Sequence, residues 1–443
     1  MLRAIRRRVG PVAKEALLAA NIEPAFVKAI FKKPPMVNGG PRSRRWPWPR
    51  RRHFDKRELN AVVKLMHREF RRGGAIVYGG PEEKAYSQEF AEYLGGGFAK
   101  AVNSGTNAVY VALRALDLEP GSEVIVSPIT DQGGVMPVAM MNCIPVPADS
   151  DPSSINTSAE QIAKMITPRT SAILIAHISG HPLDMDPIME LATKHKIPVV
   201  EDCAQAHGAI YKGRMIGTIG QISAFSTMFG KHHSTGAQGG VVFTRDTMLF
   251  ARARMIADRG KPSGVVCPSG NIIASLNFNQ DEISMAIGRV QLKKLPAALE
   301  VRRAFVAAVD EGLKGVDGLE LVRPPKDSVG AYWFLLVRLD FSKLCCTSKE
   351  FGDALAAEGI GGVYGGYPFF PPDHPWYRNA IVYGSSGLPW SLVQQKPQAF
   401  ELPNARRANA MMVRVDVHEQ LGPKDAGDLV AALKKLACYF AEK

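Results

Sequence analysis

Long hydrophobic runs are missing from this sequence. No apolar stretch reaches the roughly 18 residues that a helix needs to cross a membrane, and stretches such as residues 172–176 have only the length of a strand. Apolar residues still make up 46% of the 443 residues and charged residues 22%, which is ordinary for a globular protein. We therefore expect two or three domains with large cores and no integral membrane segment.

Cysteine is scarce and shows no pairing pattern. The six cysteines are scattered, with no Cys-x-x-Cys pair and no histidines at the spacing of metal ligands. Disulfide frameworks and structural zinc sites both depend on such regular spacings. The pattern favours reduced thiols and a cytoplasmic location, and it argues against a metal site.

Acidic residues are nearly absent from the first 52 residues. This segment holds fourteen Lys and Arg but only Glu15 and Glu23 as acids, so it carries +12 of the net charge of +13. The rest of the chain is close to neutral, whereas a nucleic-acid-binding domain carries its positive charge on the folded body. We therefore expect residues 1–52 to form a basic, solvated arm on a neutral body, and we do not expect nucleic acid as a partner.

The arm lacks the features of a secretory signal. Its apolar stretch, residues 12–31, is interrupted by Asn21, Glu23 and Pro24 and shows no small-residue cleavage pattern. An Arg-rich, acid-poor start also fits an organelle transit peptide. Attraction of the arm to a membrane surface or to nucleotide phosphates is a further alternative.

From Asp55 onward the pattern is that of a folded domain. Helical spacing of apolar residues predicts helices over residues 59–70 and 82–94, on either side of a glycine-rich break. Short apolar strands then alternate with helices, which indicates an α/β fold whose mostly parallel, seven-stranded sheet is sandwiched by helices. The expected strands are residues 99–103, 123–127, 144–147, 172–176, 198–201, 224–226 and 240–244.

The C-terminal part of the chain has a different pattern of expected helices and strands. A long helix is expected from about Asp281 to Phe305 or beyond, with Pro296 as a point where it could kink. Strands and helices then alternate in the pattern of a smaller α+β domain. We therefore divide the chain into a basic arm (1–52), a large domain (53–305) and a small domain (306–443).

One lysine follows the sixth expected strand. The strand at residues 224–226 leads into Lys231, and a glycine-rich segment at 236–240 follows. A lysine that attacks a carbonyl must lose its proton, which requires partial desolvation or nearby cations. Small flanking residues allow backbone to approach a flat, phosphorylated cofactor. A solvated loop lysine is the ordinary alternative. The adjacent His232 and His233 are interpreted as packed residues, because two histidines without further ligand spacing rarely bind a metal.

Two other strand ends carry residues suited to the same chemistry. Ser104, Gly105 and Thr106 follow the first strand and open a helix, where backbone N–H groups and hydroxyls form a phosphate cradle. Asp202 follows the fifth strand, where a buried acid needs a partner such as the protonated nitrogen of a cofactor ring. A simple helix cap is the alternative at both places. Glu201, by strand alternation, should point to the other face of the sheet.

The order of these motifs is similar to that of a known family. Ser-Gly-Thr at 104–106, Glu-Asp-x-Ala-Gln-Ala-His-Gly at 201–208 and Phe-Ser-x4-Lys at 225–231 follow one another along the chain. Together they resemble the DegT/DnrJ family of pyridoxal-phosphate-dependent sugar aminotransferases, which have the aspartate aminotransferase fold (fold type I). The resemblance extends from about Asp55 to the C-terminus and implies pyridoxal 5'-phosphate (PLP) as the cofactor.

The resemblance also implies a role for each motif residue. Lys231 would form the Schiff base with the cofactor and shuttle the proton between substrate carbons. Asp202 would pair with the pyridine nitrogen, and Gln205 would lie close to the ring and its 3′-oxygen. The phosphate would be held by Gly105, Thr106 and Ser226, with Ser104 beside them.

A further segment, residues 275–283, concerns the assembly. The family supplies an asparagine from a neighbouring subunit, and Asn277 stands at that position here. The resemblance thus implies a homodimer with shared active sites. Two positions depart from the family pattern: Asn279 replaces an arginine, and Asp131 replaces an aromatic residue that stacks on the cofactor ring. Asp131 cannot stack, so the ring must be covered otherwise or the register is shifted.

These features predict a PLP-dependent aminotransferase that moves an amino group from glutamate or glutamine to a keto-sugar, expected to be nucleotide-linked. Amination of a free cyclitol ketone such as an inosose is a close alternative. Sugar dehydration is weaker, because that branch of the family has histidine in place of the lysine, and residue 231 is Lys. The alternative from another class is a regulatory protein that binds nucleic acid through the basic arm.

Overall fold

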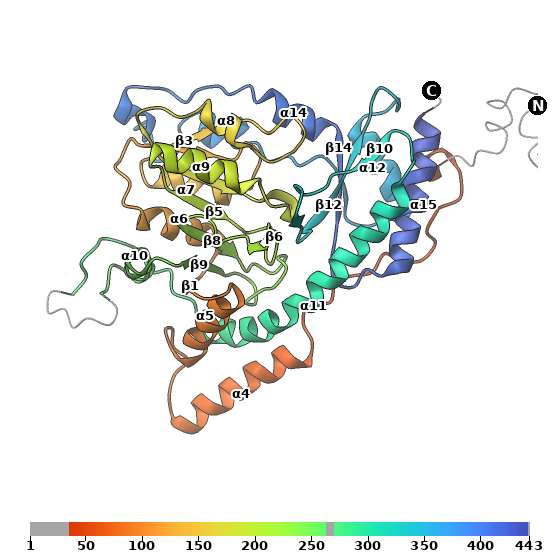
Figure 1. Cartoon of the computed structure of the whole chain (residues 1–443). Coiled ribbons are helices and arrows are strands. Elements are labelled where there is room, and N and C mark those ends of the chain that lie inside the picture. Colours follow the sequence, from red (N-terminus) through yellow and green to blue (C-terminus); the bar gives the residue numbers. More distant parts are fainter. Residues whose placement is uncertain (1–34, 263–269, 442–443) are drawn as a thin grey trace, which may run out of the picture.

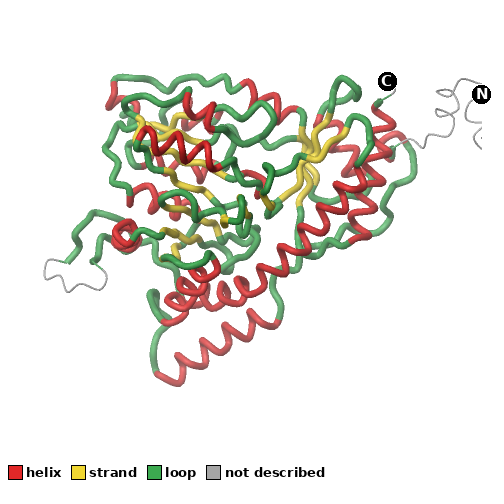
Figure 2. Tube along the Cα trace, in the orientation of Figure 1, coloured by secondary structure: helices red, strands yellow, loops and turns green. Residues whose placement is uncertain are grey.

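A computed structural model describes residues 35–262 and 270–441 of the chain (Figure 1). The first 34 residues of the predicted basic arm, including its apolar stretch, and Cys267 lie outside the described residues. The described part forms a large α/β body and a smaller α+β body (Figures 1 and 2). One long helix, α11 (Glu282–Leu313), runs from the first body to the second.

The large body is built on the seven strands that the sequence predicts. They form one sheet in the order β1-β9-β8-β5-β4-β2-β3. Pairing is parallel from β3 through to β8, and only β9 runs antiparallel to its neighbours β8 and β1. The strands are β1 (Phe98–Val102), β2 (Glu123–Val126), β3 (Ile144–Pro147), β4 (Thr170–Ala176), β5 (Val199–Asp202), β8 (Ile222–Ser226) and β9 (Gly240–Thr244).

Helices cover both faces of this sheet, as short, largely apolar and buried strands require. Consecutive strand residues such as Ile173 and Leu174 belong to different core clusters, one on each face. One face packs against α5 (Pro81–Tyr93), α8 (Ala159–Ala163), α9 (Met185–His195) and the first half of α11. The other face packs against α6 (Gly105–Ala115), α7 (Met136–Met140) and α10 (Thr247–Ala257). The predicted α/β sandwich is confirmed.

The small body has a core of its own. A four-stranded antiparallel sheet of order β10-β12-β14-β13 packs against α12 (Ser348–Ala357), α15 (Pro423–Phe440) and the second half of α11. Pro296 lies inside α11, which continues for 32 residues. The boundary near residue 305 stays a prediction, since α11 belongs to both cores. The strands are β10 (Leu319–Leu321), β12 (Phe334–Leu339), β13 (Val363–Gly365) and β14 (Met412–Asp416).

The remaining elements are short or peripheral. Helix α4 (Lys56–Arg72) begins with a capping box from Asp55 and lies outside α11, against which it packs. A small sheet joins β6 (Ile210–Tyr211), β7 (Arg214–Met215) and β11 (Ser328–Val329). Helices α13 (Pro375–Arg378) and α14 (Pro403–Ala410) lie in the long connection between β13 and β14. Within residues 35–262 and 270–441, no helix has both the length and the apolarity to span a membrane.

The last third of the predicted arm, residues 35–52, is part of the folded body. Residues 35–52, here called the N-terminal strap, run beside α15 before the chain enters α4 (Figure 1). Arg44 in the strap is 5% exposed and forms ion pairs with Asp425 and Asp428 of α15. The expectation of a solvated arm is therefore wrong where Arg44 anchors residues 35–52 to the small body, although most of these residues are exposed. Composition suggested solvation, but specific acids on the small body pair with Arg44 and Arg51.

Candidate active site

The loops that follow β1, β5 and β8 meet around a cavity of about 270 Å³ at the carboxyl ends of the strands. Ligands bind at this edge in parallel α/β sheets, because helix N-termini and loops converge there. Seven of the residues singled out from the sequence line this cavity: Ser104, Gly105, Thr106, Asp202, Gln205, Ser226 and Lys231. The structure thus brings together residues that lie more than a hundred positions apart, while their individual roles stay predictions.

Lys231 is buried in the wall of this cavity. Its side chain is 7% exposed, and its Nζ lies 3.8 Å from the centre of the Trp333 ring. Burial lowers the pKa of Lys231 to about 8, although the charges of Asp202 and Asp131 act in the opposite direction. With that pKa, about a tenth of the amine is unprotonated at pH 7, against roughly 0.03% for an ordinary lysine. This is the state that a nucleophilic lysine needs.

Trp333 was not identified as a site residue from the sequence. It lies immediately before β12 of the small body, and its indole N–H donates to the backbone carbonyl of Gly230 at 2.9 Å. The Trp333 ring therefore comes from the small body and lines one side of the cavity. Nothing in the local pattern marks it, since a Trp at the start of a strand is ordinary core or edge composition.

Asp202 ends β5 and is almost fully buried. Burial raises the pKa of its carboxyl group, while a hydrogen bond from Ala204 N–H at 3.0 Å and the charge of Lys231 partly oppose that shift. Its second carboxylate oxygen, Oδ2, faces Gly134, where an added Cβ would lie only 2.8 Å away. An acid in this position is held ready for a positively charged or N–H-bearing partner.

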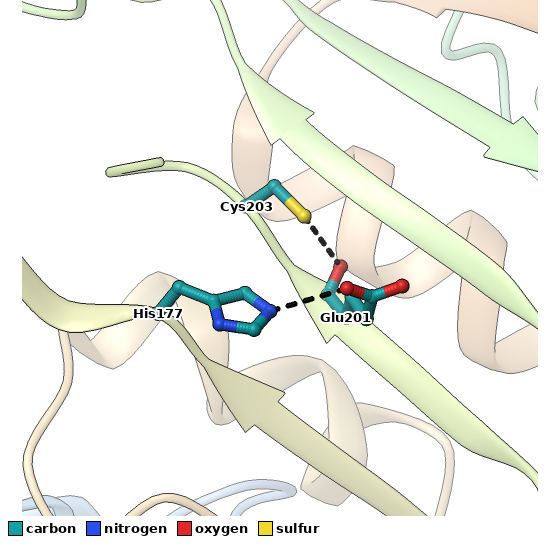
Figure 3. A group of neighbouring side chains, drawn as sticks. All are labelled: His177, Glu201 and Cys203. Carbon is teal, nitrogen blue, oxygen red and sulfur yellow. Dashed lines mark hydrogen bonds and ion pairs between the residues drawn. The ribbon is translucent and has the colours of Figure 1, made fainter. Parts of the chain in front are cut away.

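Glu201 points to the opposite face of the sheet, as strand alternation predicts. Its carboxylate accepts backbone N–H bonds from Gly217 at 2.8 Å and Gly220 at 2.7 Å, and Nε2 of His177 lies 3.2 Å away (Figure 3). Nδ1 of His177 accepts from Leu183 N–H, so the ring proton sits on Nε2 and is donated to Glu201.

Cys203 lies beside this pair, and its thiol is directed to the backbone carbonyl of Glu201 (Figure 3). His177, Glu201 and Cys203 offer atoms within 4.8 Å of one another, which is close enough to hold a metal ion. The carboxylate and both ring nitrogens of this group already have protein partners. We therefore interpret the group as a structural contact that joins the end of β4 to β5.

Close packing of glycines brings the cavity loops together. A Cβ on Gly105 would lie 2.5 Å from the Cβ of Ser226, and one on Gly133 would lie 2.4 Å from the Oγ1 of Thr106. Only glycine allows these loops to approach so closely. Ser104 serves as the N-cap of α6, with its hydroxyl accepting from Asn107 N–H at 3.1 Å. The helix cap that the sequence also allows is therefore present, and Ser104 lines the cavity as well.

Gln205 and Asp131 complete the polar lining. Gln205 donates to the Tyr367 hydroxyl at 3.1 Å and accepts from Ser179 N–H at 2.9 Å, so its amide is held in one orientation. Asp131 is exposed at the cavity wall and accepts from Gly133 N–H at 2.9 Å. The acid at the expected aromatic position therefore faces the cavity, and the indole of Trp333 is an aromatic ring that lines it.

The histidines behind Lys231 are packed, as interpreted from the sequence. Nδ1 of His233 lies 3.1 Å from Nδ1 of His207, and its Nε2 lies 2.8 Å from the Tyr86 hydroxyl. Nε2 of His232 lies 3.1 Å from the carbonyl of Ala331. Burial lowers the pKa of His207 to about 3. The cluster is therefore neutral at physiological pH.

Asn277 is the one predicted site residue that lies away from the cavity. It is exposed, and its side-chain oxygen accepts from the backbone N–H of Asn279 at 3.2 Å. Asn279, in turn, accepts from Lys100 at 3.3 Å. Within one chain, Asn277 and the other predicted site residues are therefore not brought together.

Comparisons with known proteins agree with this geometry. The sequence profile of the DegT/DnrJ/EryC1/StrS aminotransferase family matches residues 55–434. L-glutamine:2-deoxy-scyllo-inosose aminotransferase of Micromonospora echinospora is 31% identical, with 92% of this chain and 98% of the relative covered. The dTDP-3-amino-3,4,6-trideoxy-alpha-D-glucose transaminase of Streptomyces venezuelae is 36% identical, over a match that covers 59% of this chain and 68% of the length of that relative.

A solved structure gives the same result for the fold. The aminotransferase from Psychrobacter cryohalolentis superposes with a TM-score of 0.77 at 29% identity, and 89% of this chain and 99% of that chain are covered. The fold is therefore that of the type I aminotransferases. The match of the family profile to most of the chain and the cavity residues lead to one conclusion: this chain belongs to the DegT/DnrJ/EryC1/StrS aminotransferase family.

Proposed function

We propose that the cavity binds PLP and that Lys231 is the residue that holds it covalently. The observation that carries this proposal is a single buried lysine with a pKa of about 8 that shares a cavity with Asp202 and the N-terminus of α6. When bound, PLP supplies an electron sink for proton removal at the carbon that bears the amino group. The donor set fits such a group, because it offers an amine, a buried acid and a helix N-terminus.

Each residue then has a task that follows from its position. Backbone N–H groups at Gly105 and Thr106, at the start of α6, favour a phosphate, and Ser226 lies against Gly105. Asp202 keeps a ring nitrogen protonated, which also relieves the cost of burying its own carboxylate. The amine of Lys231 removes and returns the substrate proton, for which a pKa near neutrality is suited.

The substrate that we propose is a keto-sugar, with glutamate or glutamine as the amino donor. Support comes from the exposed carboxylate of Asp131 at the cavity wall, which can bind hydroxyls. The S. venezuelae relative is named for a dTDP-linked sugar. A cavity of about 270 Å³ is at the small end of ligand sites. A nucleotide would therefore have to lie outside it, on the surface around its mouth.

A free cyclitol ketone is the second candidate. The M. echinospora relative, named for an inosose substrate and L-glutamine, covers nearly all of both chains. A cyclitol carries no nucleotide, so this substrate would need no further binding surface around the mouth of the cavity. Both candidates use the same amine transfer to a ring ketone.

We further propose a homodimer with shared sites in the cytoplasm. Asn277 is exposed beside Leu276, which is 66% exposed, and Val77 and Tyr78 lie on the segment that pairs with residues 281–282. Apolar side chains exposed next to a polar residue of a predicted site are typical of an interface. Cys143 and Cys203 are buried thiols, which fits a reducing compartment.

A substrate screen tests the proposed reaction. The enzyme is first converted to its amino form with L-glutamine or L-glutamate, and keto-sugars and inososes are then added one at a time. The correct ketone should restore the absorbance that the cofactor had before it reacted with the amino donor. Mass spectrometry should detect the amine that corresponds to this ketone. Failure of both amino donors to convert the cofactor would contradict the proposed donor class, whichever ketone is used.

A further inference from the structure

The N-terminal strap is anchored to the small domain by buried charge. Arg44 contacts Asp425 at 2.8 Å and Asp428 at 2.7 Å, both on α15. The backbone N–H and the hydroxyl of Ser43 both donate to the carboxylate of Glu358 at 2.7 Å. Charge-assisted hydrogen bonds of this kind are stronger than neutral ones and fix geometry. The strap is therefore held in place before it reaches the active-site loop.

At its end, the strap contacts the loop that carries Lys231. One terminal nitrogen of Arg51 donates to the carbonyl of Gly230 at 3.1 Å, and the other donates to the carbonyls of Lys231 at 2.8 Å and His232 at 3.3 Å. Its Nε donates to Glu419 at 2.9 Å. One guanidinium thus spans three consecutive carbonyls centred on Lys231.

Glu419 ties this contact to the rest of the molecule. Its second oxygen lies 3.1 Å from Arg302 of α11, which is 1% exposed and also donates to the carbonyl of Tyr332 at 3.0 Å. Tyr332 is next to Trp333, whose indole donates to Gly230 and lies over Lys231. The lysine loop is therefore clamped between the strap on one side and the small domain on the other.

We propose that Arg51 is a positioning residue for Lys231: it fixes the lysine loop against the small domain so that Nζ projects into the cavity. The proposal rests on the proposed role of Lys231. Arg51 lies four residues before residue 55, where the match of the family profile begins. Misplacement of a reacting group by about 1 Å costs about 100-fold in rate, so a clamp of this kind affects turnover directly.

Hydrogen exchange and kinetics of the full-length holoenzyme test this role. In Arg51→Ala, amides of residues 229–235 should exchange at least about tenfold faster, because three carbonyls lose their donor and the loop opens more often. The turnover number should fall about 10- to 100-fold, with a smaller change in KM for the amino donor. Arg51→Lys keeps a cation within reach of the carbonyls and should recover part of both effects.

Arg52→Ala is the matched control, since Arg52 is exposed and adjacent. It should leave exchange and turnover unchanged. Unchanged exchange at residues 229–235 in Arg51→Ala, or an equal effect of Arg52→Ala, would overturn the proposal, as would no recovery by Arg51→Lys. Borohydride reduction tests the role of Lys231 separately from the role of Arg51. A cofactor mapped to another lysine would refute the role of Lys231. The exchange data would still report whether Arg51 holds the loop.

Discussion

The burial of Lys231 makes a quantitative prediction for the apoprotein. Lowering its pKa from 10.5 to about 8 means that the charged amine destabilises the folded apoprotein below pH 8. The penalty is about 3 kcal/mol. Lys231→Met keeps the volume and removes the charge, but it also loses the contact with Trp333, worth about 1 kcal/mol or more. The variant should therefore be more stable than the wild type at pH 7 by about 1–2 kcal/mol.

The sign of the pH dependence follows from proton binding. Between pH 8 and pH 10.5 the folded amine is mostly neutral, whereas the unfolded amine is still protonated. The unfolded state then binds more protons, so wild-type stability rises with pH in this window relative to Lys231→Met. The advantage of the variant should largely vanish by about pH 10.5, where the folded amine is neutral and the unfolded amine is half deprotonated.

Urea unfolding of both apoproteins from pH 7 to pH 10.5 measures this difference. The cofactor must be removed from both proteins, because a ligand bound to the native state adds to its stability. Lys434→Met, at an exposed position on α15, is the control for loss of a surface charge. Parallel curves for Lys231→Met and the wild type across this range would refute the claim that a charged amine is desolvated in the cavity.

Three further predictions concern the other parts of the account. Asp202→Asn should still bind the cofactor but lose about 100-fold or more in turnover, because a neutral amide does not hold the ring nitrogen protonated; unimpaired turnover would move this role to another residue. Lys231→Ala and Asn277→Ala chains, each inactive alone, should regain activity after mixing if Asn277 serves the partner's site; proven subunit exchange without rescue would argue against shared sites. Deletion of residues 1–34 should raise the apparent KM for an anionic nucleotide-sugar at low salt and leave kcat nearly unchanged, and the difference should fade as the screening length falls to about 8 Å; equal KM values at every salt concentration would show that this segment has no part in binding.

The fold and most of the cavity could be predicted from the sequence, and the physical reasons are local. Short apolar strands and the helices between them carry their own periodic pattern, so all seven strands of the large sheet were found within two residues of their observed ends. Ser104, Asp202 and Lys231 directly follow strands or lie in the next loop, so topology alone brings them to one edge.

Long-range contacts are what the sequence pattern did not reveal. Trp333 reaches the cavity from the small domain, and Arg51 in the strap contacts the backbone of the loop that carries Lys231. Each contact joins residues about a hundred or more positions apart. Composition made the strap look solvated, because pairing with Asp425, Asp428 and Glu419 depends on tertiary structure. The short strands β10 and β13 were missed because three residues carry too little periodicity to identify.

The attachment site of the cofactor tests the central claim most directly. Purified protein supplied with PLP should show a visible absorbance band that borohydride abolishes, and peptide mapping should then find the reduced cofactor on Lys231. The account predicts this single adduct, and it predicts that Lys231→Ala forms none. A reduced adduct on any other lysine, with Lys231 unmodified, would contradict it.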